Sequence, residues 1–275
     1  MKKLGFIGTG NLASSIIKGL MESDNDYSIS AFDVLEEKLN TVSKEYGVVP
    51  RSIEKVIEYS DIIIMAVKPK DILKLLSGIK NTSIDGKLFI STAAGISLEV
   101  YEQSIAQAAF VRVMPNTSSA VLHSVTGLAR GKNVTDEQVK AAEDIFLSIG
   151  KVLWIEDAKI NALTAVSGSG PAYIYLFTEY MVKAGKKIGL TDEESQLLAV
   201  ETVVGAGKML AQSKKSPSEL RAAVTSPNGT TYAALCSFSD AGLDEIILEA
   251  MKACKERAEE MEGEYTGANN KEGSN

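Results

Sequence analysis

The spacing of hydrophobic and polar positions changes a little past the middle of the chain. Up to about residue 155, short apolar runs alternate with segments in which apolar residues recur every three or four positions. This alternation predicts strands and helices in turn, as in a doubly wound parallel sheet. Beyond residue 156 only long apolar segments with helical spacing follow. We therefore predict an α/β domain at 1–155, an all-helical (all-α) domain at 156–263 and a flexible tail at 264–275.

The two patterns also place the individual elements. The predicted strands are the short apolar runs Leu4–Ile7, Tyr27–Phe32, Val48–Pro50, Asp61–Val67, Lys87–Ser91, Ala109–Val113, Thr126–Ala129 and Lys151–Ile155. The predicted helices of the first domain are Leu12–Leu20, Val34–Tyr46, Ile53–Tyr59, Asp71–Ile79 and Thr135–Ile149, the last with Thr135 as its N-cap. Those of the second are Asn161–Lys187, Asp192–Lys214, Ser218–Val224, Thr231–Phe238 and Asp244–Glu262.

A glycine-rich turn joins the first predicted strand to the first predicted helix. The segment Gly8–Ala13 reads G-T-G-N-L-A, a G-x-G-x-x-A pattern in the strand–turn–helix context that gives it meaning. Gly8 would make the turn, Gly10 would leave room for a pyrophosphate, and the first N–H groups of the helix would bind the phosphates. The α/β domain is thus predicted to be a Rossmann-like, doubly wound dinucleotide-binding domain. The alternative is that these glycines only turn a strand into a helix.

Ligand-binding residues of such sheets gather in the loops that follow the strands. Asp33 closes the second strand, where a carboxylate accepts hydrogen bonds from a ribose and repels a 2′-phosphate. This favours NADH, although Lys38 nearby leaves NADPH open. In the loops after later strands, Lys68 could face the cofactor or only solvent. The small residues Ala93–Gly95 could leave room for a ribose or nicotinamide or could only form a turn. The candidate cofactor-binding residues are Ile7, Gly8, Thr9, Gly10, Asn11, Leu12, Asp33, Ala66, Val67, Lys68, Pro69, Ala93, Ala94, Gly95, Met114, Pro115 and Asn116.

Two stretches of the helical domain interrupt its apolar pattern. Ser167–Tyr173 contains two glycines and a proline, which cost helix stability unless a neighbouring helix or a ligand approaches closely. Leu220–Tyr232 contains a helix end, a Ser-Pro-Asn-Gly turn and a new helix start, whose free N–H groups can bind a carboxylate. Ser226, Thr230 and Thr231 are also ordinary N-cap residues, so a purely structural role is open.

Composition and charge narrow the possible partners. The chain has 275 residues, 45% hydrophobic and 24% charged, with a net charge of -7, which disfavours nucleic acid. We expect no membrane segment, because no apolar run reaches the roughly 18 residues required. Met1–Lys3 leads directly into the first strand, so we also expect no signal peptide and a cytoplasmic protein. Cys236 and Cys254 are expected to be reduced thiols, and the single His123 offers little for a metal site.

The long helical segments predict self-association. Ala162–Tyr180 and Leu197–Leu210 are apolar around much of their circumference. A monomer would leave part of that surface exposed to water, and a second copy would cover it. We therefore expect a homodimer at least.

Taken in order, these motifs resemble those of the pyrroline-5-carboxylate reductase family. The resemblance runs from Leu4 to about Met261, and Thr225–Thr231 (T-S-P-N-G-T-T) is its most diagnostic segment. The ordered set comprises Ile7–Ala13, Ala66–Pro69, Ala93–Gly95, Met114–Thr117, Ser167–Tyr173 and Val224–Thr231.

The resemblance implies the reduction of 1-pyrroline-5-carboxylate to L-proline with NADPH or NADH, the last step of proline biosynthesis. It places Thr231 near the ring nitrogen of the substrate, as a catalytic hydrogen-bond partner or proton donor. The substrate-binding residues that follow are Val224, Ser226, Gly229, Thr230 and Thr231. It further implies that the second domain is a dimerisation domain, with dimers that are often assembled into decamers.

The chain departs from the family pattern in three places. Ser118 stands where a proline is frequent, and Ser52 and Ile53 stand where an asparagine often reaches the adenosine. Asp33-Val34 replaces the polar or basic pair of members that prefer NADPH. The last two departures leave the choice between NADH and NADPH open.

Two other classes of protein fit parts of the sequence. A β-hydroxyacid dehydrogenase has a similar two-domain build but carries a lysine just beyond the glycine motif of its helical half. Here no lysine follows Gly168 before Lys183. A non-catalytic dinucleotide-sensing protein would keep Gly8 and Gly10 but would have no use for the segment Thr225–Thr231.

Overall fold

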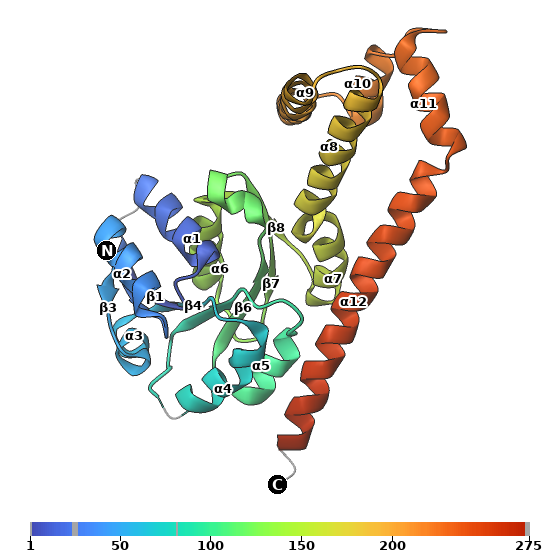
Figure 1. The fold of residues 1–275 in the computed structure, drawn as a ribbon. Coiled ribbons are helices and arrows are strands. Elements are labelled where there is room, and N and C mark those ends of the chain that lie inside the picture. The colour runs from blue at the N-terminus through green and yellow to red at the C-terminus, as the bar shows by residue number, and fades with distance from the viewer. Residues whose placement is uncertain (1, 24–26, 81, 273–275) are drawn as a thin grey trace. The chain divides into compact units, whose positions relative to one another are not determined.

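The computed structural model describes residues 2–23, 27–80 and 82–272, and the chain divides into two compact units (Figure 1). The sheet unit comprises residues 1–169 and 254–275, and the helical unit comprises residues 170–253. Residues 156–169 belong to the sheet unit because they pack on the sheet: a Cβ atom added to Gly127 would lie 2.4 Å from Leu163 Cδ1. The last helix, α12 (Leu243–Glu272), begins in the helical unit and ends in the sheet unit.

The sheet unit contains an eight-stranded sheet, in which the described strands follow the order β3-β2-β1-β4-β5-β6-β7-β8. The strands are β1 (Lys2–Ile7), β2 (Tyr27–Phe32), β3 (Val49–Pro50), β4 (Ile62–Met65), β5 (Leu88–Ser91), β6 (Ala109–Met114), β7 (Ser124–Arg130) and β8 (Gly150–Trp154). The helices are α1 (Asn11–Glu22), α2 (Glu36–Tyr46), α3 (Ile53–Tyr59), α4 (Pro69–Ile79), α5 (Leu98–Ser104), α6 (Asp136–Leu147) and α7 (Ile160–Leu163). The predicted Rossmann-like α/β architecture is confirmed.

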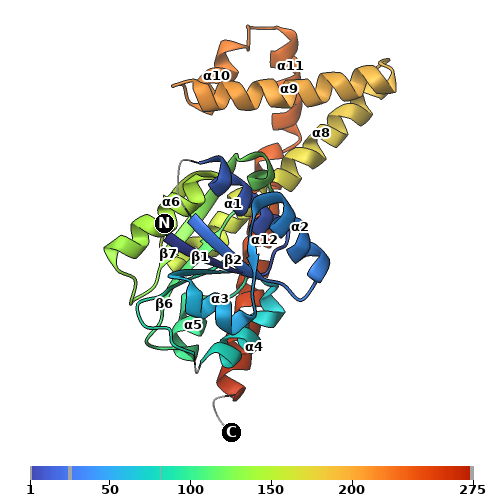
Figure 2. The ribbon, with the colours of Figure 1, turned by 90° about the vertical axis from the view of Figure 1, so that its left-hand side faces the viewer.

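Helices cover both faces of this sheet (Figures 1 and 2). Buried residues of α1, α2 and α6, among them Ile16 and Phe146, form one core with the sheet. Buried residues of α3, α4 and α5, among them Ile72 and Tyr101, form a second core on the opposite face. Because the central strands are buried on both faces, they are continuous apolar runs in the sequence.

Strand β7 is an exception within the predicted parallel sheet, because it runs antiparallel to β6. Only residues 115–123 connect the two strands, and they contain the 3₁₀ turn Thr117–Val121. A parallel crossover needs a dozen or more residues, which this connection lacks. Helix α6 supplies such a crossover between β7 and β8, which pair in parallel. The predicted N-cap of α6 is confirmed, since the Thr135 side chain accepts from the Gln138 N–H at 3.2 Å.

The long helix predicted for Asn161–Lys187 is interrupted where its glycines and proline lie. Helix α7 passes into the π-helical turn Thr164–Gly168, in which Ser169 N–H donates to Thr164 O at 2.8 Å. Helix α8 (Gly170–Lys187) then begins the helical unit. The local break expected at Ser167–Tyr173 is therefore present, and its structural form is a π-turn.

The helical unit continues with α9 (Asp192–Gln212), α10 (Pro217–Ala223), α11 (Thr230–Asp240) and the first part of α12. Capping boxes start α9 and α10, from Thr191 with Glu194 and from Ser216 with Glu219. Helix α12 extends to Glu272, so most of the tail predicted at 264–275 is helical, and 273–275 lie outside the described residues. None of the described helices combines the length and apolarity that crossing a membrane requires.

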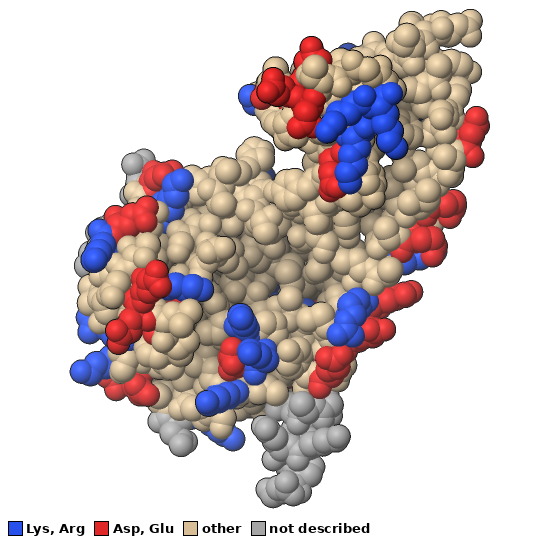
Figure 3. Space-filling view, viewed as in Figure 1, with Lys and Arg blue, Asp and Glu red and all other residues tan. Residues whose placement is uncertain are grey.

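The helical unit exposes much of its apolar surface. Figure 3 shows broad uncharged areas on its helices between small groups of charged side chains. The large apolar side chains that are half exposed or more are Ile174, Tyr175, Tyr180, Ile188, Leu197, Leu198, Met209, Leu210, Val224 and Ile246. Exposed apolar patches on this scale are typical of protein–protein interfaces.

Candidate active site

The glycine turn after β1 has the backbone geometry that its sequence predicts. Gly8 has a φ of 97°, its N–H donates to Phe32 O at 2.8 Å, and an added Cβ would lie 2.5 Å from Ala66 O. Gly10 is the N-cap of α1, and no described atom lies within 4 Å of the Cβ that it lacks. Gly8 is therefore required by the turn itself, whereas Gly10 leaves open space above the uncapped N–H groups of a helix.

Asp33 holds the same turn from the neighbouring strand. Its Oδ2 accepts from the Thr9 N–H at 2.6 Å and from the Thr9 hydroxyl at 3.0 Å, and its Oδ1 accepts from the Leu35 N–H at 2.8 Å. Partial burial opposes ionisation, but the hydrogen bonds from Leu35 and Thr9 and the charge of Lys38 outweigh it and lower the pKa of Asp33. The carboxylate is thus ionised at neutral pH and fixes the turn, a role that the sequence did not reveal.

The parallel strands bring the other predicted cofactor residues to the same edge of the sheet. Ile7 pairs with Phe32 and Met65, and Met65 pairs with Ser91, so the loops after β1, β2, β4 and β5 start side by side. The first loop residue after β4, Ala66, donates its N–H to Ile7 O at 2.8 Å. Lys68 is the N-cap residue of α4, and its side chain is exposed, which is compatible with both predicted positions, toward a ligand or in solvent.

The structure gives a backbone reason for glycine at position 95. It has a φ of 72°, and an added Cβ would lie 3.1 Å from Met261 Cβ on helix α12. Gly95 is buried, so its glycine identity follows from the backbone turn and the close approach of α12. Ala94, next to it, is only half-buried and lines a cavity.

The loop after β6 is fixed by Asn116. Its amide Nδ2 donates to Ser167 O at 2.9 Å, and its Oδ1 accepts from the Ser118 N–H at 3.1 Å. Its own N–H donates to Ser124 Oγ at 3.2 Å. The side chain therefore ties the loop to the π-turn and begins the 3₁₀ turn before β7, while Met114 and Pro115 remain buried beside it.

A cavity of about 280 Å³ lies within the sheet unit at these loops. Ala94, Gly95 and Met114 of the predicted set line it together with seven residues outside that set. These are Asn161, Thr164, Ser169, Cys254, Arg257, Ala258 and Met261. Cys254 in this wall and Cys236 in the helical unit are both free cysteines in the structure. The contribution of α12 was not predicted, because Met261 and Gly95, which lie in contact, are more than 150 positions apart in the sequence.

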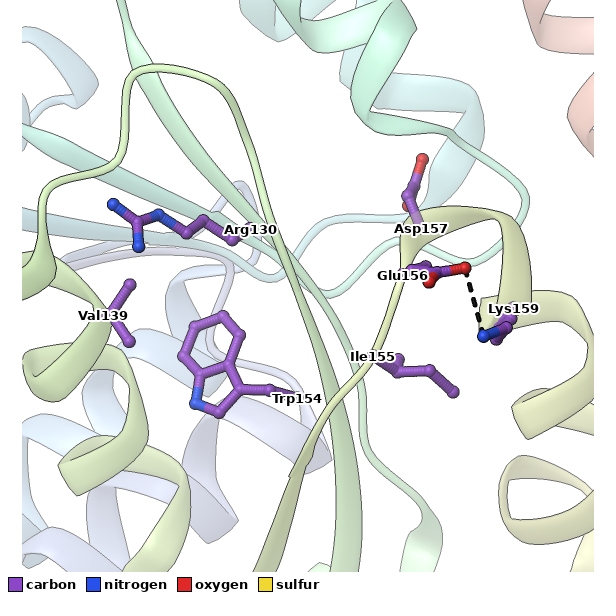
Figure 4. Close-up of a pocket in the computed structure, with 7 residues that line it drawn as sticks. All are labelled: Arg130, Val139, Trp154, Ile155, Glu156, Asp157 and Lys159. Carbon is purple, nitrogen blue, oxygen red and sulfur yellow. Dashed lines mark ion pairs between the residues drawn. The ribbon is translucent and has the colours of Figure 1, made fainter.

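A larger hollow of about 600 Å³ lies away from the predicted residues, beside the edge strand β8 (Figure 4). Arg130, Val139 and Trp154 line one part of it, and Glu156 and Lys159, which form an ion pair at 3.1 Å, line another. No residue of the predicted cofactor or substrate sets contributes to its wall. The larger of these two hollows is therefore not the one that the predicted residues line.

The second predicted site lies in the helical unit, between α10 and α11. Asn228 has a φ of 59°, and Gly229 N–H donates to Ser226 O at 3.0 Å. A Cβ added to Gly229 would lie 2.3 Å from Ser226 Oγ, which would have to rotate away, and 3.1 Å from Ser226 O. Gly229 is the N-cap of α11 and no described side chain caps the helix, which leaves the first N–H groups, those of Thr230 and Thr231, to face outward.

The comparisons with known proteins together cover nearly the whole chain. The family model for pyrroline-5-carboxylate reductase dimerisation matches residues 157–261, and the model for NADP oxidoreductase, coenzyme F420-dependent, matches residues 3–95. The chain is 35% identical over 275 residues to pyrroline-5-carboxylate reductase 2 of Bacillus subtilis, with 98% of each chain covered.

Two solved structures agree in fold over nearly the full length. A pyrroline-5-carboxylate reductase from Coxiella burnetii has a TM-score of 0.88 and 33% identity, with 94% of this chain and 97% of that chain covered. The Plasmodium falciparum pyrroline carboxylate reductase, solved with NADP bound, has a TM-score of 0.81 and 30% identity, with 95% and 98% covered.

A Rossmann-like sheet with its glycine turn, followed by a helical dimerisation domain, defines a two-domain dinucleotide-dependent oxidoreductase. Identity of 35% over 98% of the chain to a pyrroline-5-carboxylate reductase narrows this class to one family. The chain belongs to the pyrroline-5-carboxylate reductase family.

Proposed function

We propose that the chain reduces 1-pyrroline-5-carboxylate to L-proline with NADPH or NADH, as the last step of proline biosynthesis in the cytoplasm. The observation that carries the proposal is the 35% identity over 98% of the chain, which includes both the glycine turn and the segment Thr225–Thr231. The dinucleotide supplies the hydride for the C=N carbon of the substrate. Free thiols at Cys236 and Cys254 fit a reducing compartment.

The residues at the sheet edge fit a dinucleotide. The open space above Gly10 and the uncapped first turn of α1 suit a pyrophosphate, because the helix N-terminus offers N–H donors and a partial positive charge. The loops at Ala66–Pro69, Ala93–Gly95 and Met114–Asn116 would receive the ribose and nicotinamide end. Thr9 and Asp33 would keep the turn in the conformation that the phosphates need.

The turn before α11 fits a small carboxylate. The N–H groups of Thr230 and Thr231 would hold the substrate carboxylate, while the N–H of Gly229 is already used by Ser226. Thr231 would donate a hydrogen bond to the ring nitrogen. A threonine hydroxyl is a weak acid, so the proton that makes the imine a good hydride acceptor comes from water or is already present. Val224 and Ser226 would complete this substrate site.

The exposed helices support a homodimer at least, built through the helical unit and open to assembly into decamers. The dimerisation model of the family matches 157–261, the region in which apolar side chains such as Leu197 are exposed. We expect light scattering to give a mass of at least twice the 29.4 kDa of one chain. Leu197→Asp should shift that mass toward the monomer, since a buried charge opposes association. A monomeric wild-type protein would contradict the proposal.

Asp33 is expected to set the preference between the two cofactors. Asp33→Ser removes the charge that would repel a 2′-phosphate, so the ratio of kcat/KM for NADPH to that for NADH should rise by about tenfold. Asp33→Asn is the matched variant, because its amide oxygen can still accept from Thr9. A ratio unchanged in both variants would show that this carboxylate does not select the cofactor.

One assay tests the function as a whole. The oxidation of NADH and of NADPH is followed by absorbance with 1-pyrroline-5-carboxylate, and L-proline is identified as the product. β-Hydroxyacids, offered in reverse with the oxidised cofactors, form the comparison. We expect turnover with the cyclic imine and none above background with the hydroxyacids. Turnover confined to hydroxyacids would reject the proposal.

A further inference from the structure

Arg112 is a fully buried charge in the middle of an apolar strand. It lies on β6 with none of its side chain exposed. Its Nη1 lies 2.9 Å from Asp157 Oδ1 and 3.1 Å from Glu262 Oε1, while Nε and Nη2 have no partner among the described residues. A buried guanidinium is costly unless carboxylates compensate it, so these two acids determine whether the charge is tolerated.

Each of the two carboxylates also holds a second element. Asp157 Oδ2 accepts from the N–H of Leu98, the first residue of α5, at 2.9 Å. Glu262 Oε2 accepts from the side-chain amide of Asn161 on α7. One guanidinium therefore joins β6, α5, α7 and the end of α12 that belongs to the sheet unit.

The elements joined at Arg112 carry the loops of the candidate cofactor site. Helix α5 begins three residues after Gly95, and Met261, the neighbour of Glu262, packs against Gly95. Arg112 and Met114 lie two positions apart on β6 and so point to the same face of the sheet. Ala94, Gly95, Met114 and Met261 all line the 280 Å³ cavity.

We propose that Arg112, through Asp157 and Glu262, is a positioning residue for the nicotinamide end of the cofactor site. It holds α12 and the start of α5 so that the loops at Ala93–Gly95 and Met114 keep the shape that receives the ring. The glycine turn, which would bind the pyrophosphate, is held separately by Asp33. The inference rests on the proposed dinucleotide site.

The test compares two ligands that differ only at the nicotinamide. The affinities of the full-length protein are measured for NADPH or NADH, whichever binds more tightly, and for the matching ADP-ribose, which lacks the ring. Glu262→Gln, which leaves Arg112 with one carboxylate, should weaken the dinucleotide by about fivefold and the ADP-ribose by less than about twofold, since misplaced loops affect only the group that they contact. The turnover number should fall with it.

A second variant and a matched control complete the test. Asn161→Ala removes the hydrogen bond to the other oxygen of Glu262 and a small part of the cavity wall but leaves both carboxylates beside Arg112, so it should be milder and show the same split between the two ligands. Arg130→Lys changes an arginine of the neighbouring strand β7 whose ion pair with Asp136 is exposed, and it should change neither affinity. Equal losses for both ligands, or no loss for either, would overturn the positioning role. A wild-type protein that binds neither dinucleotide would instead reject the proposed function.

Discussion

Replacing Thr231 by alanine is expected to lower the turnover number for 1-pyrroline-5-carboxylate by about 100-fold, near the lower end of what one positioned hydrogen-bond donor contributes in a transition state. Thr231 lies in the first turn of α11, directly after the N-cap Gly229. Its hydroxyl would stabilise the developing amine nitrogen as the hydride arrives, and alanine cannot do this. The N–H that would hold the substrate carboxylate stays in place, so the KM for the imine should change much less than kcat.

Three comparisons make this result specific to the hydroxyl. Thr231→Ser keeps a hydroxyl at the same position and should retain most of the turnover. Thr178→Ala removes a threonine hydroxyl of the same unit that donates only to Ile174 O on α8, and should leave kcat unchanged. Affinity for NADPH and NADH, measured by fluorescence, should be the same in all variants. Unchanged kinetics in Thr231→Ala would remove the residue from the mechanism.

The strands of the sheet unit could be predicted because their physical signal is local. Segments such as Tyr27–Phe32 are short, mostly apolar and bounded by polar residues, and the structure has a strand with the same bounds. The direction of β7 depended instead on the length of the connection that precedes it, which the alternating pattern does not express. Helix α5 was missed because its seven residues are too few to show a helical period.

The part of the site that depends on distant contacts could not be predicted. An arginine inside the apolar run Ala109–Val113 signals that a buried charge needs a partner, but spacing does not show which acids supply it. Asp157 and Glu262 are 45 and 150 positions away. Glycines are easier to interpret, because a turn needs them for reasons contained in the turn. The sequence therefore placed the glycine turn well and the walls of the cavity poorly.

The second large effect is expected at the glycine turn, where replacing Gly8 should lower stability and replacing Gly10 should lower affinity for the cofactor. Gly8→Ala places a Cβ 2.5 Å from Ala66 O at a φ of 97°, so the turn and the end of β4 must move. The strain alone costs of order 1–3 kcal/mol, which lowers Tm by roughly 2–4 °C for each kcal/mol. Thermal unfolding should show this loss without any cofactor present.

Gly10→Ala should lower the free energy of unfolding by only about 1 kcal/mol, the usual cost of alanine at an N-cap, because no described atom occupies the space its Cβ would enter. The same space is where we place the pyrophosphate, so affinity for NADPH and NADH should fall by more than about tenfold, or 1.4 kcal/mol. Gly78→Ala on α4, also in open space, is the control: it should leave the affinity for the dinucleotide unchanged and, as a glycine replaced within a helix, should raise stability by up to about 1 kcal/mol. If Gly10→Ala bound the dinucleotide as the wild type does, the phosphates could not lie over the start of α1.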